Sequence, residues 1–215
     1  MMAEPPGAGL PDRSQQTLVE LLTSARAQHF LGPGDIASHL AHSLAFAGLV
    51  PIAPGLAVDL GSGAGVPGLI LAVGWPESSW VLLDANARKT EFLRSAVAAL
   101  KLDDRVEVVV RRAEEAGHDA RWRGSADLVV ARGFGPPAVT AECAAPLLRV
   151  GGTVVVAEPP GGAPDRWPSD GLRLLGLVAD GRMVDPVALQ RLRLDFETPE
   201  RYARRVGIPA KRPLF

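Results

Sequence analysis

The amino-acid sequence predicts an α/β protein built on a doubly wound, mostly parallel sheet, with helices before it and an antiparallel strand pair after it. Short apolar runs, such as "LAVDL", "SWVLLDA" and "GGTVVVAE", alternate with longer segments of helical periodicity. This alternation is typical of parallel sheets that are covered by helices on both faces. Near the C-terminus, two further strand-like segments flank a turn predicted at Asp180–Gly181, which indicates the antiparallel pair.

The N-terminal part of the chain predicts two helices. Ser14 can serve as the N-cap of a helix over residues 15–31, in which leucines recur at helical spacing. Asp35 can cap a second helix, which is expected to continue until Pro51. Residues 1–13 are rich in Pro and Gly and are expected to be a disordered lead-in.

Residues 14–215 are expected to form a single domain. It consists of an N-terminal helical segment, residues 14–50, and a sheet domain, residues 56–215. The Pro- and Gly-rich stretch over residues 158–171 is interpreted as a loop, because it is too short to link two domains. Within the sheet domain, the predicted strands are residues 56–60, 79–85, 105–110, 126–132 and 151–158, and the predicted helices include residues 88–101 and 136–150, the latter interrupted at Pro146.

Composition excludes several classes of protein. The 215 residues carry a formal net charge of −1, so nucleic-acid binding would need a local basic patch. Cys143 is the only cysteine, which excludes an intramolecular disulfide and a zinc cluster; it is interpreted as a small core residue, and no metal site is expected. No apolar run approaches the ~20 residues of a membrane helix, and the first residues do not resemble a signal peptide. A reducing, cytoplasmic location is therefore expected.

A glycine-rich loop follows the first predicted strand. Gly61, Gly63 and Gly65 alternate with small residues in the stretch "VDLGSGAGVPG". Glycine permits positive φ and lets backbone N–H groups approach a ligand without hindrance from a Cβ atom. Ligands of parallel α/β sheets bind beyond the carboxyl ends of the strands, so this loop is the expected seat of a ligand.

Acidic residues end the first two predicted strands. Asp84, at the end of the second strand, can accept hydrogen bonds from both hydroxyls of a ribose, which predicts a ligand that contains adenosine. Asp59, at the end of the first strand, would face a pyrophosphate unfavourably but would suit the amino group and sulfonium of S-adenosylmethionine (SAM). Residues Gly63–Gly68 also match the G-x-G-x-x-G of dinucleotide-binding proteins, and an NAD-linked oxidoreductase is an alternative that rests on this match alone. Asp59 and the C-terminal antiparallel pair favour a class I SAM-dependent methyltransferase.

Several stretches resemble one known family. "VDLGSGAGVPGLILA", the following "LLDANARKTEFLR" and the tail "RYARRVGIPAKRPL" are similar to the GidB/RsmG family, and "HLAHSLA" resembles its His-x-x-Asp-Ser segment. Members of that family are SAM-dependent methyltransferases that act on N7 of a guanine in small-subunit ribosomal RNA. The resemblance runs from about Ile36 to Leu214, and it implies the same class I fold, the same cofactor and the same substrate.

The resemblance also implies roles for individual residues. Gly61 and Val66 would contact SAM through the glycine loop, and Ala113 and Glu114 would lie beside its adenine. Arg132, in the segment that follows the fourth strand of the sheet, would lie near both cofactor and substrate, which makes it the candidate catalytic residue.

The tail contains the one basic cluster of the sequence. It consists of Arg201, Arg204, Arg205, Lys211 and Arg212. The match to the family's C-terminal signature implies phosphate contact, with Arg204, Arg205 and Lys211 as the candidate RNA-binding residues. A basic patch of this kind would give a salt-dependent affinity for RNA.

The sequence departs from the family on the substrate side. His42 stands where the family has an aspartate, Gly133 follows Arg132 where the family has an alanine, and Glu158 stands near the place of a lysine. His39 and His42 share one helix face and are interpreted as ordinary polar positions, or as candidate bases if the methyl acceptor were a hydroxyl.

The sequence thus predicts in-line methyl transfer from SAM to guanine N7 of small-subunit ribosomal RNA. N7 carries a free lone pair and no proton, so no general base is needed, which agrees with the lack of a convincing base cluster. The expected partner is ribosomal RNA or the small ribosomal subunit, and neither a membrane nor a metal is expected. The alternatives are a relative that binds SAM without catalysis and a methyltransferase for a small molecule.

Overall fold

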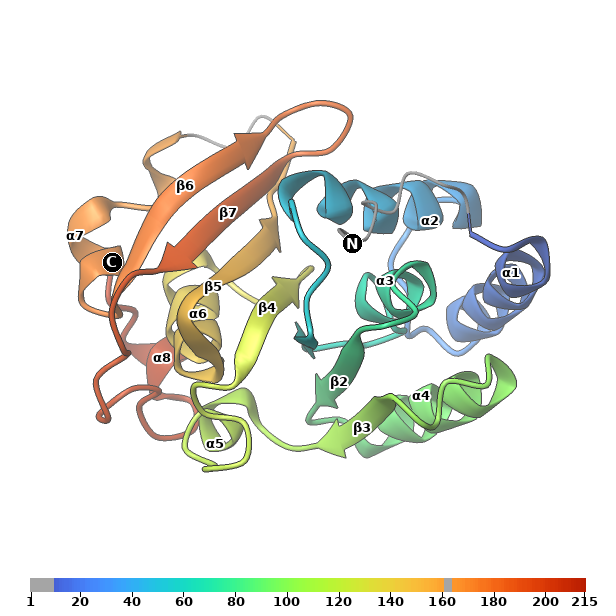
Figure 1. The fold of residues 1–215 in the computed structure, drawn as a ribbon, viewed down its shortest axis with the longest axis horizontal. Helices are drawn as coiled ribbons and strands as arrows, with labels where there is room; N and C mark the ends of the chain where they lie inside the picture. Colours follow the sequence, from blue (N-terminus) through green and yellow to red (C-terminus); the bar gives the residue numbers. More distant parts are fainter. Residues whose placement is uncertain (1–9, 161–163) are drawn as a thin grey trace.

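One mixed sheet organises the molecule. The computed structural model describes residues 10–160 and 164–215, and within them seven strands have the order β3-β2-β1-β4-β5-β7-β6. Strands β1 to β5 are parallel, and β7 is antiparallel to both β5 and β6. The predicted doubly wound, mostly parallel sheet with a C-terminal antiparallel pair is confirmed (Figure 1).

The elements follow one another in the alternating order that the sequence predicts. The strands are β1 (Leu56–Leu60), β2 (Ser79–Asp84), β3 (Val106–Val110), β4 (Ala126–Ala131), β5 (Leu148–Ala157), β6 (Leu177–Met183) and β7 (Leu189–Leu194). The α-helices are α1 (Asp12–Ala27), α2 (Ile36–Ala45), α3 (Gly68–Gly74), α4 (Ala87–Ala99), α5 (Ala113–Ala116), α6 (Pro137–Ala144), α7 (Ser169–Arg173) and α8 (Ile208–Lys211). Three short 3-10 helices are η1 (Phe46–Leu49), η2 (Ala145–Leu147) and η3 (Pro164–Arg166).

The two faces of the sheet bury two hydrophobic clusters. Successive side chains of a strand point to opposite faces, so Trp80 and Leu82 of β2 join one cluster and Val81 and Leu83 join the other. The first cluster also contains buried residues of α1 to α4, and the second contains those of α5, α6 and α7 (Figure 1). Both faces are therefore covered, which explains why the strands read as continuous apolar runs.

The N-terminal helices pack on the sheet, and the first of them begins earlier than predicted. α1 starts at Asp12, so Ser14 lies inside the helix and does not cap it. Leu10 is buried, which makes the expected disordered lead-in wrong for residues 10–13; residues 1–9 lie outside the described residues. The cap predicted for α2 is confirmed, because an Asp35 carboxylate oxygen accepts the N–H of Ser38 at 2.6 Å.

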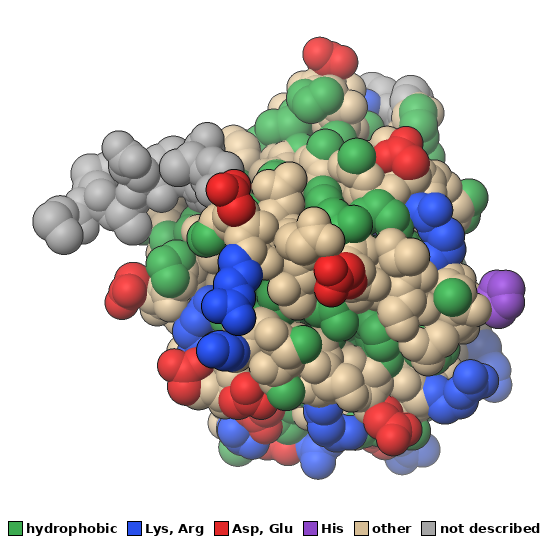
Figure 2. Space-filling model, turned by 90° about the vertical axis from the view of Figure 1, so that its right-hand side faces the viewer, with side chains coloured by type: hydrophobic (Ala, Val, Ile, Leu, Met, Phe, Trp, Pro, Cys, Tyr) green, Lys and Arg blue, Asp and Glu red, His purple; other side chains and the backbone are tan. Residues whose placement is uncertain are grey.

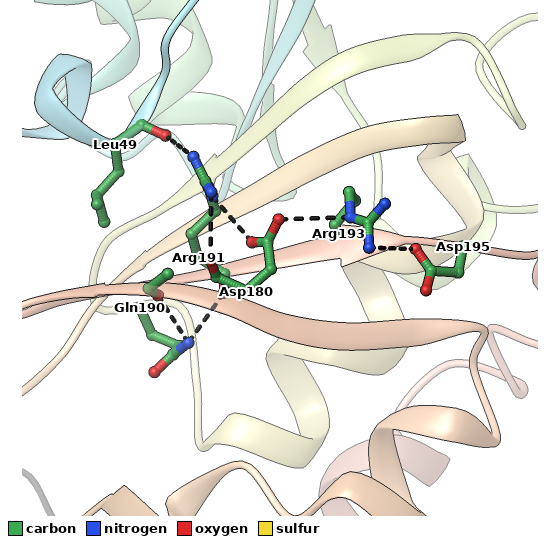
Figure 3. Close-up of polar contacts among 7 residues, drawn as sticks. Leu49, Asp180, Gln190, Arg191, Arg193 and Asp195 are labelled. Carbon is green, nitrogen blue, oxygen red and sulfur yellow. Dashed lines mark hydrogen bonds and ion pairs between the residues drawn. The ribbon is translucent and has the colours of Figure 1, made fainter.

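The predicted turn at Asp180–Gly181 is wrong. These residues belong to β6, where the register with β7 shifts between Ala179 and Gly181, and the strands are joined only after Met183. Arg191 of β7 explains the difference, since it donates to the carboxylate of Asp180 at 2.9 Å and to the carbonyl of Leu49 at 2.9 Å (Figure 3). The Asp-Gly pair is thus held in the strand by a partner that local sequence does not reveal.

The surface over the N-terminal helices carries charges of both signs. Acidic and basic side chains are interspersed on the face that lies to the right in Figure 1 (Figure 2). Among the described helices, none combines the length and the apolar character that crossing a membrane requires.

Arg123 fastens the C-terminal segment to the loop before β4. Its guanidinium donates at 2.6–3.2 Å to four carbonyl oxygens, those of Gly117, Thr198, Pro199 and Tyr202. Because the carbonyls come from two segments about eighty residues apart in the chain, a single side chain joins what the sequence separates.

We predict that Arg123→Met lowers the free energy of unfolding by about 2–3 kcal/mol, because hydrogen bonds from a charged donor each contribute about 1.5–3 kcal/mol and the freed carbonyls are left without it. Arg121→Met is the matched control, since Arg121 pairs with the half-exposed Glu107 at the surface and should cost less than about 1 kcal/mol. Urea unfolding measures both values. Equal losses in the two variants would contradict the role of Arg123.

Candidate active site

Two cavities meet beyond the carboxyl ends of the parallel strands. The Glu114 cavity has a volume of about 340 Å³, and its walls include Gly61, Asp84, Ala113, Glu114, Gly207 and Ala210. The Arg132 cavity has a volume of about 360 Å³, and its walls include Phe30, His39, Gly63, Val66 and Arg132. Gly61, Lys89 and Gly133 border both, so the two cavities form one crevice over the glycine loop.

The glycine loop leaves its main chain bare toward the crevice. Gly61 has a φ of +73°, and a Cβ atom there would lie 2.7 Å from the ring of Phe134. Both the backbone conformation and the space therefore require glycine at this position. Gly61 and Gly63, which carry no side chain, border the crevice, so a ligand there can approach their peptide groups closely.

Asp84 fixes the middle of the glycine loop. It ends β2, and its Oδ2 accepts the N–H of Gly63 at 2.9 Å, while its Oδ1 accepts the N–H of Asn86 at 2.8 Å. The carboxylate borders the Glu114 cavity, as expected for a ribose ligand. Each oxygen retains a second lone pair for a further donor.

Asp59 lies beneath the loop. Its side chain is fully buried, its Oδ2 accepts the N–H of Gly68 at 3.0 Å, and its Oδ1 has no partner among the described residues. Burial raises the pKa of Asp59 to about 7, against the opposing effect of the Gly68 N–H. Asp59 borders neither cavity. The structure therefore gives it a contact to the start of α3, and its predicted action on a cofactor would pass through the loop.

The acid that follows β3 lies against the C-terminal segment. Ala113 and Glu114 begin α5 and border the Glu114 cavity. Glu114 is buried, and its Oε1 accepts the N–H of Gly207 at 2.9 Å. Gly207 and Ala210 thus complete a wall of the cavity from the far end of the chain.

The half-buried Arg132 and the buried His39 form a pair at the Arg132 cavity. Nη2 of Arg132, directly after β4, donates to Nδ1 of His39 at 2.8 Å, and Nη1 is buried without a partner among the described residues. Burial lowers the pKa of Arg132. Burial, and then the charge of Arg132, lower the pKa of His39 and bring that of His42 to about 4. The earlier interpretation of His39 as an ordinary polar helix position is wrong, since only 4% of its surface is exposed.

The basic tail divides into anchored and exposed side chains. Arg204 donates to both carboxylate oxygens of Glu142, at 2.8 and 2.6 Å, and Glu142 is fully buried. The expectation of RNA contact is therefore corrected for Arg204, whose guanidinium serves as an internal anchor. Arg205 and Lys211 are exposed and remain candidates.

Three parts of the crevice were not predicted from the sequence. Lys89, at the start of α4, borders both cavities, and Phe134 covers Gly61. Gly207 was visible in the family-like tail, but only its contact with Glu114 assigns it to the cavity. For Lys89, the one signal in the sequence was its position in the first turn of the helix that follows Asp84, the acid at the end of β2.

Comparison with known proteins decides the family. The family described as "GidB: rRNA small subunit methyltransferase G" matches residues 21–158. The chain belongs to this family. The ribosomal RNA small subunit methyltransferase G of Rubrobacter xylanophilus is 34% identical over 94% of this chain and 85% of its own length. The protein of that name from Syntrophomonas wolfei is 31% identical over 93% of this chain and 98% of its own length.

Solved structures agree with the fold. The cofactor-bound Rv0187 from MTB superposes with a TM-score of 0.58 at 18% identity, over 90% of this chain and 99% of that chain. A branched-chain polyamine synthase from Thermus thermophilus gives a TM-score of 0.63 at 17% identity, over 88% and 65%. As a member of this family, and with this fold, the chain is a class I SAM-dependent methyltransferase. SAM is its cofactor.

We predict that Asp59 makes the stability of the cofactor-free protein fall as the pH rises. A carboxyl whose pKa is raised in the folded state binds its proton more tightly there, so its contribution is complete below pH about 4 and is lost as the pH passes about 7. Between pH 5 and pH 8, the wild type should lose about 2–3 kcal/mol of unfolding free energy relative to Asp59→Asn. Urea unfolding of both proteins at the two pH values tests this, and a constant difference between them would refute it.

Proposed function

We propose that the protein transfers a methyl group from SAM to N7 of a guanine in small-subunit ribosomal RNA. The observation that carries the proposal is the set of ionisable side chains around the Arg132 cavity. Both ring nitrogens of His39 are engaged, and the other ionisable side chains among the described wall residues are the cations Lys89 and Arg132. An acceptor that carries a proton would require a base there, whereas the lone pair of guanine N7 does not. Relatives of 31–34% identity carry the name ribosomal RNA small subunit methyltransferase G.

The residues of the crevice fit SAM. We assign the ribose hydroxyls to Asp84 and the adenine to the wall formed by Ala113 and Glu114. The methionine end would then lie over the bare main chain of Gly61 and Gly63, beside Val66, in the Arg132 cavity. SAM, when bound, supplies a methyl group activated by its sulfonium. Arg132, whose charge no described acid neutralises, offers the donor that the carboxylate of a methionine requires.

The work of the protein in this reaction is alignment. An in-line displacement requires the acceptor lone pair to face the bond that breaks, and such positioning is worth ~7–11 kcal/mol in favourable cases. The junction of the two cavities, bordered by Gly61, Lys89 and Gly133, is where cofactor and acceptor would meet. Arg132 lines the Arg132 cavity, and its chain neighbour Gly133 lies at the junction. Arg132 is therefore the proposed catalytic residue. At the buried base of the loop, Asp59 accepts the N–H of Gly68 and the carbonyl of Gly65 accepts the N–H of Leu69, and these contacts would keep the crevice in shape.

We further infer that residues 14–215 act as one methyltransferase domain. Buried residues of α1 and α2, such as Leu18 and Leu40, share a hydrophobic cluster with the sheet. Work on ribosomal RNA would place the enzyme in the cytoplasm, where small subunits are found.

Methyl transfer to small ribosomal subunits from a strain that lacks this enzyme tests the proposal. We predict incorporation of one methyl group per subunit, recovered as 7-methylguanosine by mass spectrometry.

Asp84→Ala should weaken SAM binding at least tenfold, because the ribose loses its acceptor and the loop loses the contact to Gly63. Asp103→Ala removes an exposed acid beyond α4 and is the control.

Each alternative has its own outcome in this experiment. Tight SAM binding without transfer to subunits would favour a non-catalytic relative, and methylation of a small molecule alone would favour the other alternative. Absence of SAM binding in calorimetry would overturn the proposal altogether.

The exposed cations of the tail should contribute to RNA affinity through phosphate contacts. We predict that Arg205→Gln and Lys211→Gln each weaken binding to the small subunit and each reduce the slope of log K against log salt by about 1. Lys101→Gln is the control. Lys101 is exposed and lies just after the C-terminal end of α4, whereas the cavity residue Lys89 lies near its start, so this change should leave the slope unchanged. Filter binding over a series of KCl concentrations measures the slopes. An unchanged slope in both tail variants would exclude the tail from the RNA interface.

A further inference from the structure

Arg132 is a half-buried cation whose charge the protein does not neutralise. Among the described residues, no carboxylate lies within ion-pair distance of its guanidinium, and Nη1 has no hydrogen-bond partner. Within the described part of the chain, its one hydrogen bond to a side chain is that of 2.8 Å from Nη2 to Nδ1 of His39. A buried N–H group of a cation is unfavourable without an acceptor, so Nη1 calls for an acceptor from outside the chain, and an anion would suit its charge best.

The geometry fixes the protonation state of His39. A guanidinium can only donate, so Nδ1 of His39 must accept and carries no proton. The ring proton then resides on Nε2, which faces the carbonyl of Gly32 at 3.3 Å. Both ring nitrogens are thus used in the neutral imidazole, which spans from the loop before α2 to the end of β4.

We propose that His39 is a positioning residue: its neutral ring holds the Arg132 guanidinium at the cavity wall, where that guanidinium binds the carboxylate of SAM. The inference rests on the proposed function. Asp84 and Glu114, at the Glu114 cavity, assign the adenosine end to that side, so the amino-acid end lies in the Arg132 cavity. Its carboxylate is the one anionic group of the cofactor, and it meets there a cation that lacks an anion.

The charged surroundings of His39 predict the effect of pH. Arg132 and Arg26 disfavour the protonated ring, Asp35 favours it, and His42 faces the same guanidinium. Together with burial, these groups keep the pKa of His39 below its ordinary value of 6.5. Protonation would convert Nδ1 into a donor opposite Arg132. The hydrogen bond that holds the guanidinium, and with it the affinity for SAM, should therefore be lost as the pH falls through the lowered pKa of His39.

Calorimetric binding of SAM and of decarboxylated SAM tests this, because the two ligands differ only in the carboxylate. At pH 7.5 the wild type should prefer SAM by at least about tenfold, as expected for a charge-assisted contact. His39→Phe keeps a ring but removes the acceptor, and its preference should fall below about threefold. His39→Asn places an amide oxygen near the position of Nδ1 and should retain the preference. His42→Asn, on the same helix but without a bond to Arg132, is the control and should also retain it.

The pH series separates positioning from a merely structural role. The preference of the wild type for SAM should decline once the pH falls through the lowered pKa of His39, whereas that of His39→Asn, which does not titrate, should stay constant. A preference in His39→Phe equal to that of the wild type, or equal losses of affinity for both ligands, would overturn the inference. So would a wild type that binds both ligands alike, because SAM binding would then stand without the carboxylate contact. Failure of the wild type to bind SAM at all would instead refute the proposed function.

Discussion

Two carboxylates at neighbouring strand ends hold the glycine loop, and the cofactor site depends on them. β1 and β2 are adjacent and parallel, with Leu60 opposite Leu83, so Asp59 and Asp84 come to the same edge of the sheet. Asp84 accepts the N–H of Gly63 from the side of the crevice, and Asp59 accepts the N–H of Gly68 from beneath. Buried backbone donors need acceptors, and here side chains supply them where no strand or helix does. The loop can therefore turn sharply and still present bare main chain to a ligand.

The fold could be predicted from the sequence as far as local patterns determine it. The apolar runs and the helical periodicity between them reproduce the alternation of strands and helices, and the strand beginning at Leu56 was located to the residue. The turn placed at Asp180–Gly181 failed because Asp-Gly is a strong local turn signal, whereas the observed strand depends on Arg191 across the hairpin. A contact between residues of two strands can be predicted only if the strands are known to be neighbours. Local propensity does not give that information.

The candidate site shows the same division. The glycine loop and Asp84 could be placed at the crevice from the sequence because they are separated by short spacings along the chain. His39 was misjudged because its hydrogen-bond partner Arg132 lies 93 residues away in the sequence. Arg204 was misjudged for a similar reason: its partner Glu142 lies on an alanine-rich helix and gives no sign in the sequence of being buried. From sequence alone, a charged residue is expected to be exposed. Charged residues are usually buried only when they are paired, and the partner is not known until the fold is.

The C-terminal segment joins the cofactor cavity to the surface proposed to meet RNA. Gly207, whose N–H donates to Glu114, lies two residues after Arg205 and four before Lys211. Separating Arg204 from the fully buried Glu142 would leave an unpaired charge, which typically costs about 3–5 kcal/mol, so the segment is firmly anchored. The two exposed cations therefore project from a fixed base, and they lose less conformational entropy on meeting phosphates than they would on a free arm. Because the same segment forms a wall of the Glu114 cavity, where we propose that the adenine binds, an RNA that contacted it would be brought next to the cofactor, as alignment with the methyl group requires.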